Sequence, residues 1–318
     1  VGGYRVTAIG DSAFSQCGNI TGITFAEDSS VTSIGNSAFK NCSSLTGISI
    51  PASVTSLGNR VFDSCTKLTD VKFADGSNLK SIGDYSFKNC KTLREIKIPD
   101  GVSKIGNNAF SDCTLLVGIE LPSNLERIGD YAFYYCRKLE SISIPEGVKS
   151  IGASAFYRCT ELKEINIPES VESIGTSAFY SCTGLTSIVM PENVKSLGSY
   201  VFYDCTNLKD ISVPSTISEI GECVFDGCDS LEYKLEDGVS YLGNEANPYA
   251  VLISASDTVA KKFTINENTA VIYTGAFENL ASLENIEISE NVKHIGPYAF
   301  SGCSSLTNVS IPDNVTSV

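Results

Sequence analysis

The sequence predicts an α/β repeat fold, a solenoid of about twelve to thirteen coils with short strands on one side and short helices on the other. Two observations carry this prediction. An Ile-Gly or Leu-Gly dipeptide recurs from Gly10 to Gly221 in steps of 23 residues, with two steps of 25, and again at Gly296, and Phe and Cys follow each glycine at constant spacing. One such unit is too small to bury its apolar residues, whereas stacked copies share one continuous core. The glycines are Gly10, Gly35, Gly58, Gly83, Gly106, Gly129, Gly152, Gly175, Gly198, Gly221 and Gly296.

The segment after each glycine predicts the helix. In IGDYAFYYC, residues 128–136, Ala132, Phe133 and Cys136 stand at positions i, i+1 and i+4. This spacing is typical of one buried face of a helix of one or two turns. An Asp or Asn follows the glycine in many copies, and we expect it to cap the first amides of that helix.

Two further segments of the unit predict extended chain. Ile142 and Ile144 alternate with Ser141 and Ser143, which indicates a short strand that ends at a proline. Residues 148–151 place Val and Ile around two polar residues and indicate a second short extended or turn segment. The unit therefore runs from helix to strand to a second extended piece.

Eleven of the twelve cysteines occupy one column of the repeat, and only Cys223 lies off it. Equivalent residues of neighbouring coils are about 5 Å apart. That spacing exceeds the roughly 3.5–4.5 Å between Cβ atoms in a disulfide, so we expect free thiols packed as small apolar residues. The twelve phenylalanines of the neighbouring column, from Phe14 to Phe300, should likewise form one internal file.

The strand segments resemble the leucine-rich repeat, with LTGISI at 45–50, LREIKI at 93–98 and LKEINI at 162–167. The 23-residue unit is similar to the BspA-like, treponemal-type subclass of these repeats. The resemblance implies a leucine-rich-repeat solenoid. It also implies a surface or secreted protein of a host-associated bacterium or a protist, acting in adhesion, with variable contact residues and no shared catalytic motif.

The repeat loosens in one region and divides the chain in three. Residues 1–228 form a regular array, residues 229–270 form irregular coils with an expected hairpin insertion, and residues 271–318 resume the repeat. Lys234 stands at an isoleucine position and Leu280 replaces the column cysteine. The insertion around 241–262 is either an elaboration that bends the solenoid or a loop that contacts a ligand.

Composition excludes several classes of function. The formal charge of −14 argues against a nucleic-acid partner, which is bound by neutralising phosphates. No apolar run approaches 18 residues, so we expect no membrane insertion in this segment. His294, the single histidine, stands at an outward position, and no C-x-x-C pair occurs. We therefore predict no catalytic residues, no metal site and no cofactor.

One outward column is aromatic in four successive coils. The residue after the column Phe is Tyr134, Tyr157, Tyr180 and Tyr203, with Tyr131, Tyr135 and Tyr200 beside them. We call these seven residues the tyrosine strip. Either the rings stack and shield the surface without further purpose, or the strip is a contact patch for a protein or glycan. The polar outer face of the strands, with residues such as Lys97 and Glu120, is the other candidate surface.

The sequence thus predicts a non-catalytic binding or adhesion module, not an enzyme. We expect it at the cell surface or secreted, by resemblance, as one segment of a longer protein. The alternative is a purely structural spacer that displays another domain.

Overall fold

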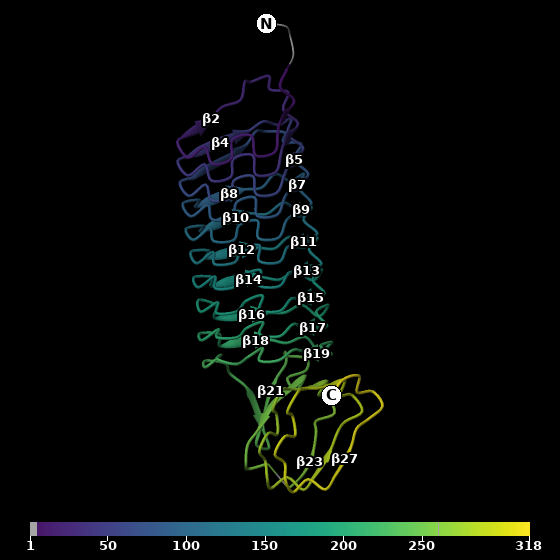
Figure 1. Cartoon of the computed structure of the whole chain (residues 1–318). Coiled ribbons are helices and arrows are strands. Elements are labelled where there is room, and N and C mark those ends of the chain that lie inside the picture. Colours follow the sequence, from purple (N-terminus) through teal and green to yellow (C-terminus); the bar gives the residue numbers. More distant parts are fainter. Residues whose placement is uncertain (1–4, 260) are drawn as a thin grey trace.

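The computed structural model describes residues 5–259 and 261–318. The chain winds into a long stack of coils, the first array, and then into a shorter second array whose coils turn away from the first axis (Figure 1). With about 13 turns, the predicted solenoid is confirmed. Within the described residues, no helix is long and apolar enough to cross a membrane.

A continuous parallel sheet of ten short strands lines one side of the first array. Each strand is the Ser-Ile type dipeptide that precedes the repeat glycine, and it pairs with the same dipeptide of the next coil, as Ser150 pairs with Ser173. The strands are β1 (Ala8–Ile9), β3 (Ser33–Ile34), β5 (Ser56–Leu57), β7 (Ser81–Ile82), β9 (Lys104–Ile105), β11 (Arg127–Ile128), β13 (Ser150–Ile151), β15 (Ser173–Ile174), β17 (Ser196–Leu197) and β19 (Glu219–Ile220).

The alternating Ser-Ile segment forms the second column of strands, as predicted. Ile142 points inward and is buried, while Ser141 and Ser143 are exposed. These strands pair in groups of two or three rather than in one sheet. They are β2 (Gly22–Ile23), β4 (Gly47–Ile50), β6 (Asp70–Phe73), β8 (Glu95–Lys97), β10 (Gly118–Glu120), β12 (Ser141–Ser143), β14 (Glu164–Asn166), β16 (Ser187–Val189) and β18 (Asp210–Ser212).

The prediction of short helices is wrong. The segment after each glycine is a series of linked turns, even though Ala132, Phe133 and Cys136 are buried as expected. The backbone of Tyr131 (φ 57°) and Tyr135 (φ 58°) is left-handed. A right-handed helix cannot pass through such residues.

Hydrogen bonding explains why the chain prefers these turns. The amide of Ala132 donates to Gly129 within the coil (3.3 Å), whereas that of Phe133 donates to Ala155 of the next coil (2.8 Å). The same alternation continues, with the amide of Tyr135 donating to Tyr157 at 2.8 Å. Every second amide therefore joins neighbouring coils, which a helix would prevent by using all of its amides internally.

The Asp or Asn after the glycine has a different role from the predicted helix cap. Its carboxylate or amide oxygen accepts the backbone N–H of the equivalent residue in the next coil, as Asp130 Oδ1 does from Ala153 at 3.0 Å. Five more such bonds, at 2.6–2.9 Å, connect the coils from Asp11 to Asp130. The glycine allows this close approach: a Cβ on Gly152 would lie 2.6 Å from the Asp130 nitrogen.

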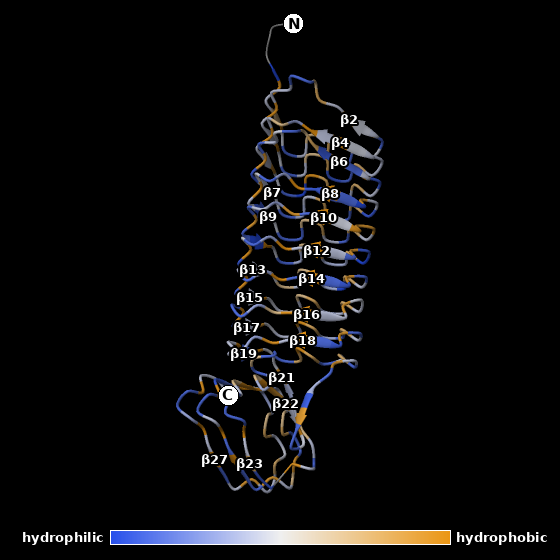
Figure 2. Cartoon of the chain, turned by 180° about the vertical axis from the view of Figure 1, so that it is seen from behind, coloured by the Kyte–Doolittle hydropathy of each residue, from blue (hydrophilic) through white to orange (hydrophobic). Residues whose placement is uncertain are grey.

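The core is a file of aligned side chains, as predicted. Phe156 is fully buried and stacks on Phe133 and Phe179, each at 5.3 Å between ring centroids. Hydrophobic residues recur at the same places of successive coils (Figure 2). Apolar burial of this repeating kind is the main stabilising contribution to the array.

The column cysteines are free thiols, and each also makes a hydrogen bond. The thiol of Cys182 donates to the carbonyl of Phe156 in the preceding coil, with Sγ and O 3.1 Å apart. Nine further column cysteines repeat this contact at 3.0–3.3 Å. The thiols thus join successive coils as well as filling space.

We expect the protein to lose stability as pH rises above about 9. Burial raises the pKa of Cys182 from 9.0 to about 12, and that of Cys65 likewise to about 12. A folded-state pKa above the unfolded one adds stability that is complete below pH 9 and is lost as pH rises towards 12. Urea unfolding at neutral and alkaline pH should show this decline.

The alkaline decline should become shallower in Cys182→Ala, because one titrating group is removed. Ser181→Ala, beside it in the chain, removes no titratable group and serves as the control. An unfolding midpoint that stays constant above pH 9 would contradict the buried-thiol assignment.

The second array begins with antiparallel strands rather than a regular coil. β20 (Lys234–Glu236) pairs with β21 (Val239–Leu242), and β21 pairs with β22 (Val251–Ala255). Asp237 (φ 48°) and Gly238 (φ 81°) form the tight turn between β20 and β21. The division into residues 1–228, 229–270 and 271–318 stays a prediction.

Parallel stacking resumes after the hairpin. β22 continues into β24 (Val271–Ile272) and β26 (His294–Ile295), and a separate sheet contains β23 (Lys262–Thr264), β25 (Asn285–Glu287) and β27 (Asn308–Ser310). Most of this array has a core cluster of its own, but Leu242, Val251 and Val271 of β21, β22 and β24 belong to the core cluster of the first array.

Tyr273 joins the two arrays. In regular coils the amide of the column Phe donates to the next coil, as Phe202 donates to Val224 at 3.0 Å. Phe225 has no such coil beyond it, and its amide donates instead to the hydroxyl of Tyr273 (3.2 Å). That hydroxyl in turn donates to Asp226 Oδ1 at 3.3 Å. A side chain of the second array therefore replaces the missing backbone carbonyl.

Candidate binding surface

The structure brings the seven tyrosines of the strip together on the turn side of four successive coils. Tyr134, Tyr157, Tyr180 and Tyr203 are half-buried, whereas Tyr131 and Tyr200 are 41% and 36% exposed. Each ring is held by the turn series described above, so its position repeats from coil to coil. The strip is therefore a continuous surface feature on a rigid support.

The four central rings stack on one another. Centroids are 4.9 Å apart between Tyr134 and Tyr157, 4.6 Å between Tyr157 and Tyr180, and 4.9 Å between Tyr180 and Tyr203. The faces of the two inner rings are covered on both sides, which leaves ring edges and hydroxyls to meet a partner. Burial and neighbouring phenols raise the pKa of Tyr134 and Tyr180, so these hydroxyls remain donors at neutral pH.

Three tyrosines of the strip occupy left-handed backbone positions. Tyr131 and Tyr135 have φ of 57° and 58°, and Tyr200 has 61°. Asn, Asp and Gly tolerate this conformation best, and an aromatic residue there is unfavourable by about 1 kcal/mol. Other coils place mostly small or polar residues at Tyr135's position: Gln16, Asn41, Ser64, Asn89, Asp112, Arg158, Ser181, Asp204 and Gly227.

Two arginines that the sequence analysis missed lie at one end of the strip. The guanidinium carbon of Arg137 is 5.0 Å from the centroid of the Tyr135 ring, and that of Arg158 is 5.7 Å away. Arg158 also donates to the Tyr135 hydroxyl at 3.3 Å. In the described part of the chain, neither guanidinium is paired with a carboxylate. Arg158 could have been found as the one cation at that column position.

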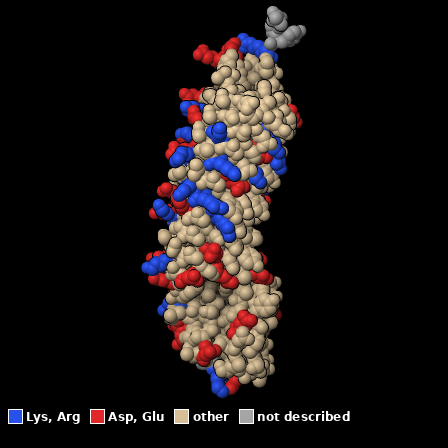
Figure 3. Space-filling model, turned by 60° about the vertical axis from the view of Figure 1, so that its left-hand side comes forward, with Lys and Arg blue, Asp and Glu red and all other residues tan. Residues whose placement is uncertain are grey.

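The outer face of the strands is charged, and some of its charges pair with each other. Lys97 lies 2.9 Å from Glu120 of the next coil, and Lys72 lies 3.0 Å from Asp70. Basic and acidic side chains also mix along one edge of the molecule, with a group of basic ones over the middle coils (Figure 3). The paired charges on this face are less available to a partner than the guanidinium groups of Arg137 and Arg158 beside the strip.

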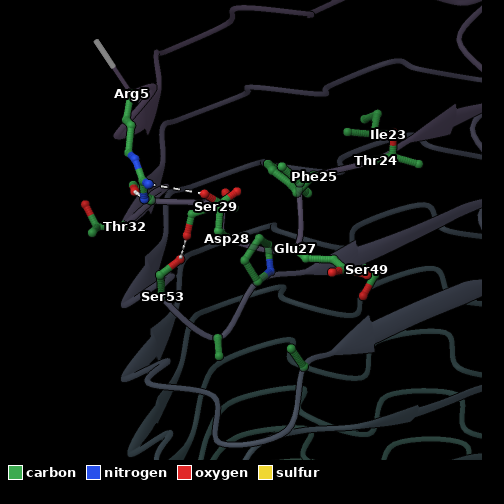
Figure 4. Close-up of a pocket in the computed structure, with 15 residues that line it drawn as sticks. Arg5, Ile23, Thr24, Phe25, Glu27, Asp28, Ser29, Thr32, Ser49 and Ser53 are labelled. Carbon is green, nitrogen blue, oxygen red and sulfur yellow. Dashed lines mark hydrogen bonds and ion pairs between the residues drawn. The ribbon is translucent and has the colours of Figure 1, made fainter. Parts of the chain in front are cut away.

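A hollow lies beside the two-residue-longer loop near the start of the chain (Figure 4). Arg5 reaches across it to Asp28 at 3.2 Å. The hydroxyl of Ser53 donates to the carbonyls of Ser29 (3.1 Å) and Val31 (2.7 Å). These polar groups are used in the chain's own contacts, so the hollow is a weaker candidate than the strip.

A catalytic site would need a cleft, and the insertion around 241–262 is the place to look for one. The structure has a hollow at the hairpin there. It is lined by residues of β20, β21 and β22 together with the turn at Asp237 and Gly238. His294 is half-buried rather than outward, beside Glu219 of β19, and burial lowers its pKa. Among residues 5–259 and 261–318, no three His, Cys, Asp or Glu side chains group to hold a metal ion.

Comparison with known proteins decides the family. The sequence matches the BspA type leucine rich repeat region in six copies, over residues 7–140, 126–250 and 256–318. The chain belongs to the BspA-type leucine-rich repeat family. Solenoids of this BspA type are generally non-catalytic.

Two solved structures share the fold of this BspA-type chain. A leucine-rich repeat protein from Bacteroides ovatus is 24% identical, with a TM-score of 0.50, covering 90% of this chain and 85% of that one. The pneumococcal vaccine antigen PcpA is 21% identical, with a TM-score of 0.51, covering 89% and 76%. At these identities the likeness shows the fold alone. Among curated proteins, none matches this chain.

Proposed function

We propose that this protein is a non-catalytic binding or adhesion module of a surface-exposed or secreted protein, and that the tyrosine strip is its contact surface. BspA-type family membership is compatible with this role. The strip adds a specific surface: aromatic rings with hydroxyls, held on a rigid array, beside two arginines that have no carboxylate partner among the described residues. Tyr and Arg are the residues most enriched where binding energy concentrates.

The observation that carries the proposal is the left-handed backbone beneath the strip. Tyr131, Tyr135 and Tyr200 occupy left-handed backbone positions that Asn, Asp or Gly would adopt at a lower cost in free energy. Residues that cost stability locally are frequent at functional sites, where their contact with a partner compensates. Tyr85 and Tyr298 share this backbone conformation outside the strip (φ 59° each), so what distinguishes the strip is left-handed tyrosines beside a stack of four rings.

We propose a protein partner rather than a glycan. Recognition of a sugar ring by tyrosine uses the open face of the aromatic ring. In the strip, Tyr157 and Tyr180 have both faces covered by neighbouring rings. Their exposed edges and hydroxyls suit the mixed apolar and hydrogen-bonding contacts of a protein interface.

We expect Tyr131→Asn with Tyr200→Asn to weaken partner binding by about tenfold or more while leaving stability unchanged or slightly higher. Asparagine relieves the left-handed backbone and removes the exposed ring. Tyr85→Asn is the matched control, because Tyr85 has the same backbone conformation (φ 59°) outside the strip. Thermal unfolding measures stability.

Binding is measured on arrays of matrix proteins and glycans, with wild type compared with a variant that carries Ser at the four central tyrosines. Signals on proteins that the variant loses support the proposal, and signals on glycans alone would contradict the choice of partner. If the chain binds nothing on either array and does not associate with itself, the result would favour the alternative that it is a structural spacer. The Tyr131/Tyr200 variant could instead lose as much stability as the Tyr85 variant and still bind its partner. That result would show that the strip only packs against the surface.

A further inference from the structure

We propose that the partner of the tyrosine strip is a second copy of this chain, packed antiparallel about a two-fold axis that crosses the solenoid between Tyr157 and Tyr180. This inference rests on the proposed function, because it names the partner of the same surface. A two-fold interface needs a surface that is complementary to itself after rotation. The strip meets that requirement in shape, in local charge and in the charge of the whole chain.

The aromatic arrangement is symmetric about the proposed axis. At one end Tyr131 meets Tyr134 edge-on, with centroids 5.5 Å apart and planes at 65°. At the other end Tyr200 meets Tyr203 edge-on, at 5.9 Å and 60°. The two inner coils carry only the stacked ring, and serine replaces the flanking tyrosine at positions 154 and 177. Rotation by a half-turn therefore superposes six of the seven tyrosines on one another, and Tyr135 falls at the place of Asp204.

The net charges at the two ends are opposite, although Asp112 lies near Tyr134 at the first end. Arg137 and Arg158 flank the first end, where Tyr135 holds them. Asp204 and Asp226 flank the other end; Asp204 accepts a hydrogen bond from Ser181 (2.8 Å) and Asp226 one from Tyr273. Within the described residues, neither aspartate has a Lys or Arg partner. A copy turned by a half-turn would bring arginines against aspartates at both ends.

The charge of the whole chain divides at the same place. Residues 1–163 contain 17 basic and 16 acidic side chains, whereas residues 164–318 contain 6 basic and 21 acidic ones. The proposed axis lies close to this division. Antiparallel packing places residues 164–228 of each first array, with 2 basic and 9 acidic side chains, over the nearly neutral coils of residues 1–163 in the other copy. Parallel packing would place the two acidic halves side by side, which is unfavourable.

The geometry specifies the opposing residues. Equivalent coils are spaced by one strand separation, so the coil of Tyr134 faces the coil of the partner's Tyr203, and Tyr157 faces the partner's Tyr180. Tyr135 has the same repeat position as Asp204, so it lies opposite the partner's Asp204. Arg137, whose guanidinium carbon is 5.0 Å from the centroid of the Tyr135 ring, then lies beside that aspartate, with Arg158 one coil away, a distance of about 5 Å. Tyr131 meets the partner's Tyr200. Each of these contacts occurs twice, as in any isologous dimer.

Charge exchange on the whole chain tests the proposal. We expect wild type to dimerise reversibly in sedimentation experiments as its concentration rises. One variant, Arg137→Asp with Arg158→Asp, has two acidic ends, and the other, Asp204→Arg, has two basic ends. Each alone should dimerise about tenfold or more weakly. An equal mixture of the two should restore dimers, because only the mixed pair brings opposite charges together at both ends.

Lys91→Asp with Arg94→Asp makes the same charge change outside the strip and should leave dimerisation unchanged. Circular dichroism of every variant shows that the fold is intact. A monomeric wild type, variants that dimerise like wild type, or a mixture that stays monomeric would each overturn the inference. The wild type could be monomeric, and array binding could still be lost when the four central tyrosines become serine. These two results together would overturn the inference but leave the proposed function standing.

Discussion

Replacing Phe156 with alanine should lower the free energy of unfolding by about 3–5 kcal/mol. Phe156 is fully buried in the middle of the first array and stacks on a ring at each side. Its removal leaves a cavity that two neighbouring coils cannot close, because both are held in register by their own backbone bonds. Urea unfolding followed by circular dichroism measures the loss.

The adjacent residue provides the matched comparison. Tyr157 is half-buried on the outer side of the same turn, so Tyr157→Ser should cost far less, about 1 kcal/mol for its stacking contacts. The two substitutions differ by one position in the sequence and by the side of the coil that each occupies. Equal losses would show that the inward and outward assignments are wrong.

Removing the side chain of Tyr273 should have the second large effect, at the junction of the arrays. Tyr273→Ala should cost about 3–5 kcal/mol, since it deletes a buried ring that packs 5.6 Å from the centroid of Phe225. Tyr273→Phe keeps the ring but leaves the Phe225 amide without its acceptor, at a cost of about 1–3 kcal/mol. The second array should therefore open before the first.

Native-state hydrogen exchange distinguishes this local effect from general destabilisation. We expect faster exchange at the Phe225 amide and through residues 229–318, with the middle of the first array unchanged. Tyr298→Phe makes the same chemical change at a tyrosine that is 70% exposed, and it should alter nothing. If Tyr273→Phe also left exchange unchanged, the hydroxyl would not be what joins the arrays.

The period of the repeat was sufficient to predict the solenoid, the buried Phe and Cys columns and the outward tyrosines. It was not sufficient for the segment after the glycine. Ala132, Phe133 and Cys136 are inward in a helix and in a series of turns alike, so their spacing does not separate the two. The recurring Asn, Ser and Gly at the position of Tyr135 were the available signal, because they favour left-handed backbone.

Other features depend on residues far apart in the sequence. The Asp-Gly pair at 237–238 is a local hairpin signal and could have placed the turn between β20 and β21. Nothing local indicates that the hydroxyl of Tyr273 accepts the amide of Phe225. The arginines beside Tyr135 are similar: Arg137 is close in sequence, but Arg158 reaches that ring from the next coil.

The sequence by itself determined which residues are equivalent and therefore which side chains stack in the core, because burial of identical apolar groups follows directly from a constant period. Only the tertiary structure decided the backbone conformation of the turns, the role of the Asp and Asn side chains, and the contacts of the tyrosine strip. The reason is that each coil satisfies half of its turn amides on its neighbour. A coil's conformation is thus set by the stack and not by its own residues alone.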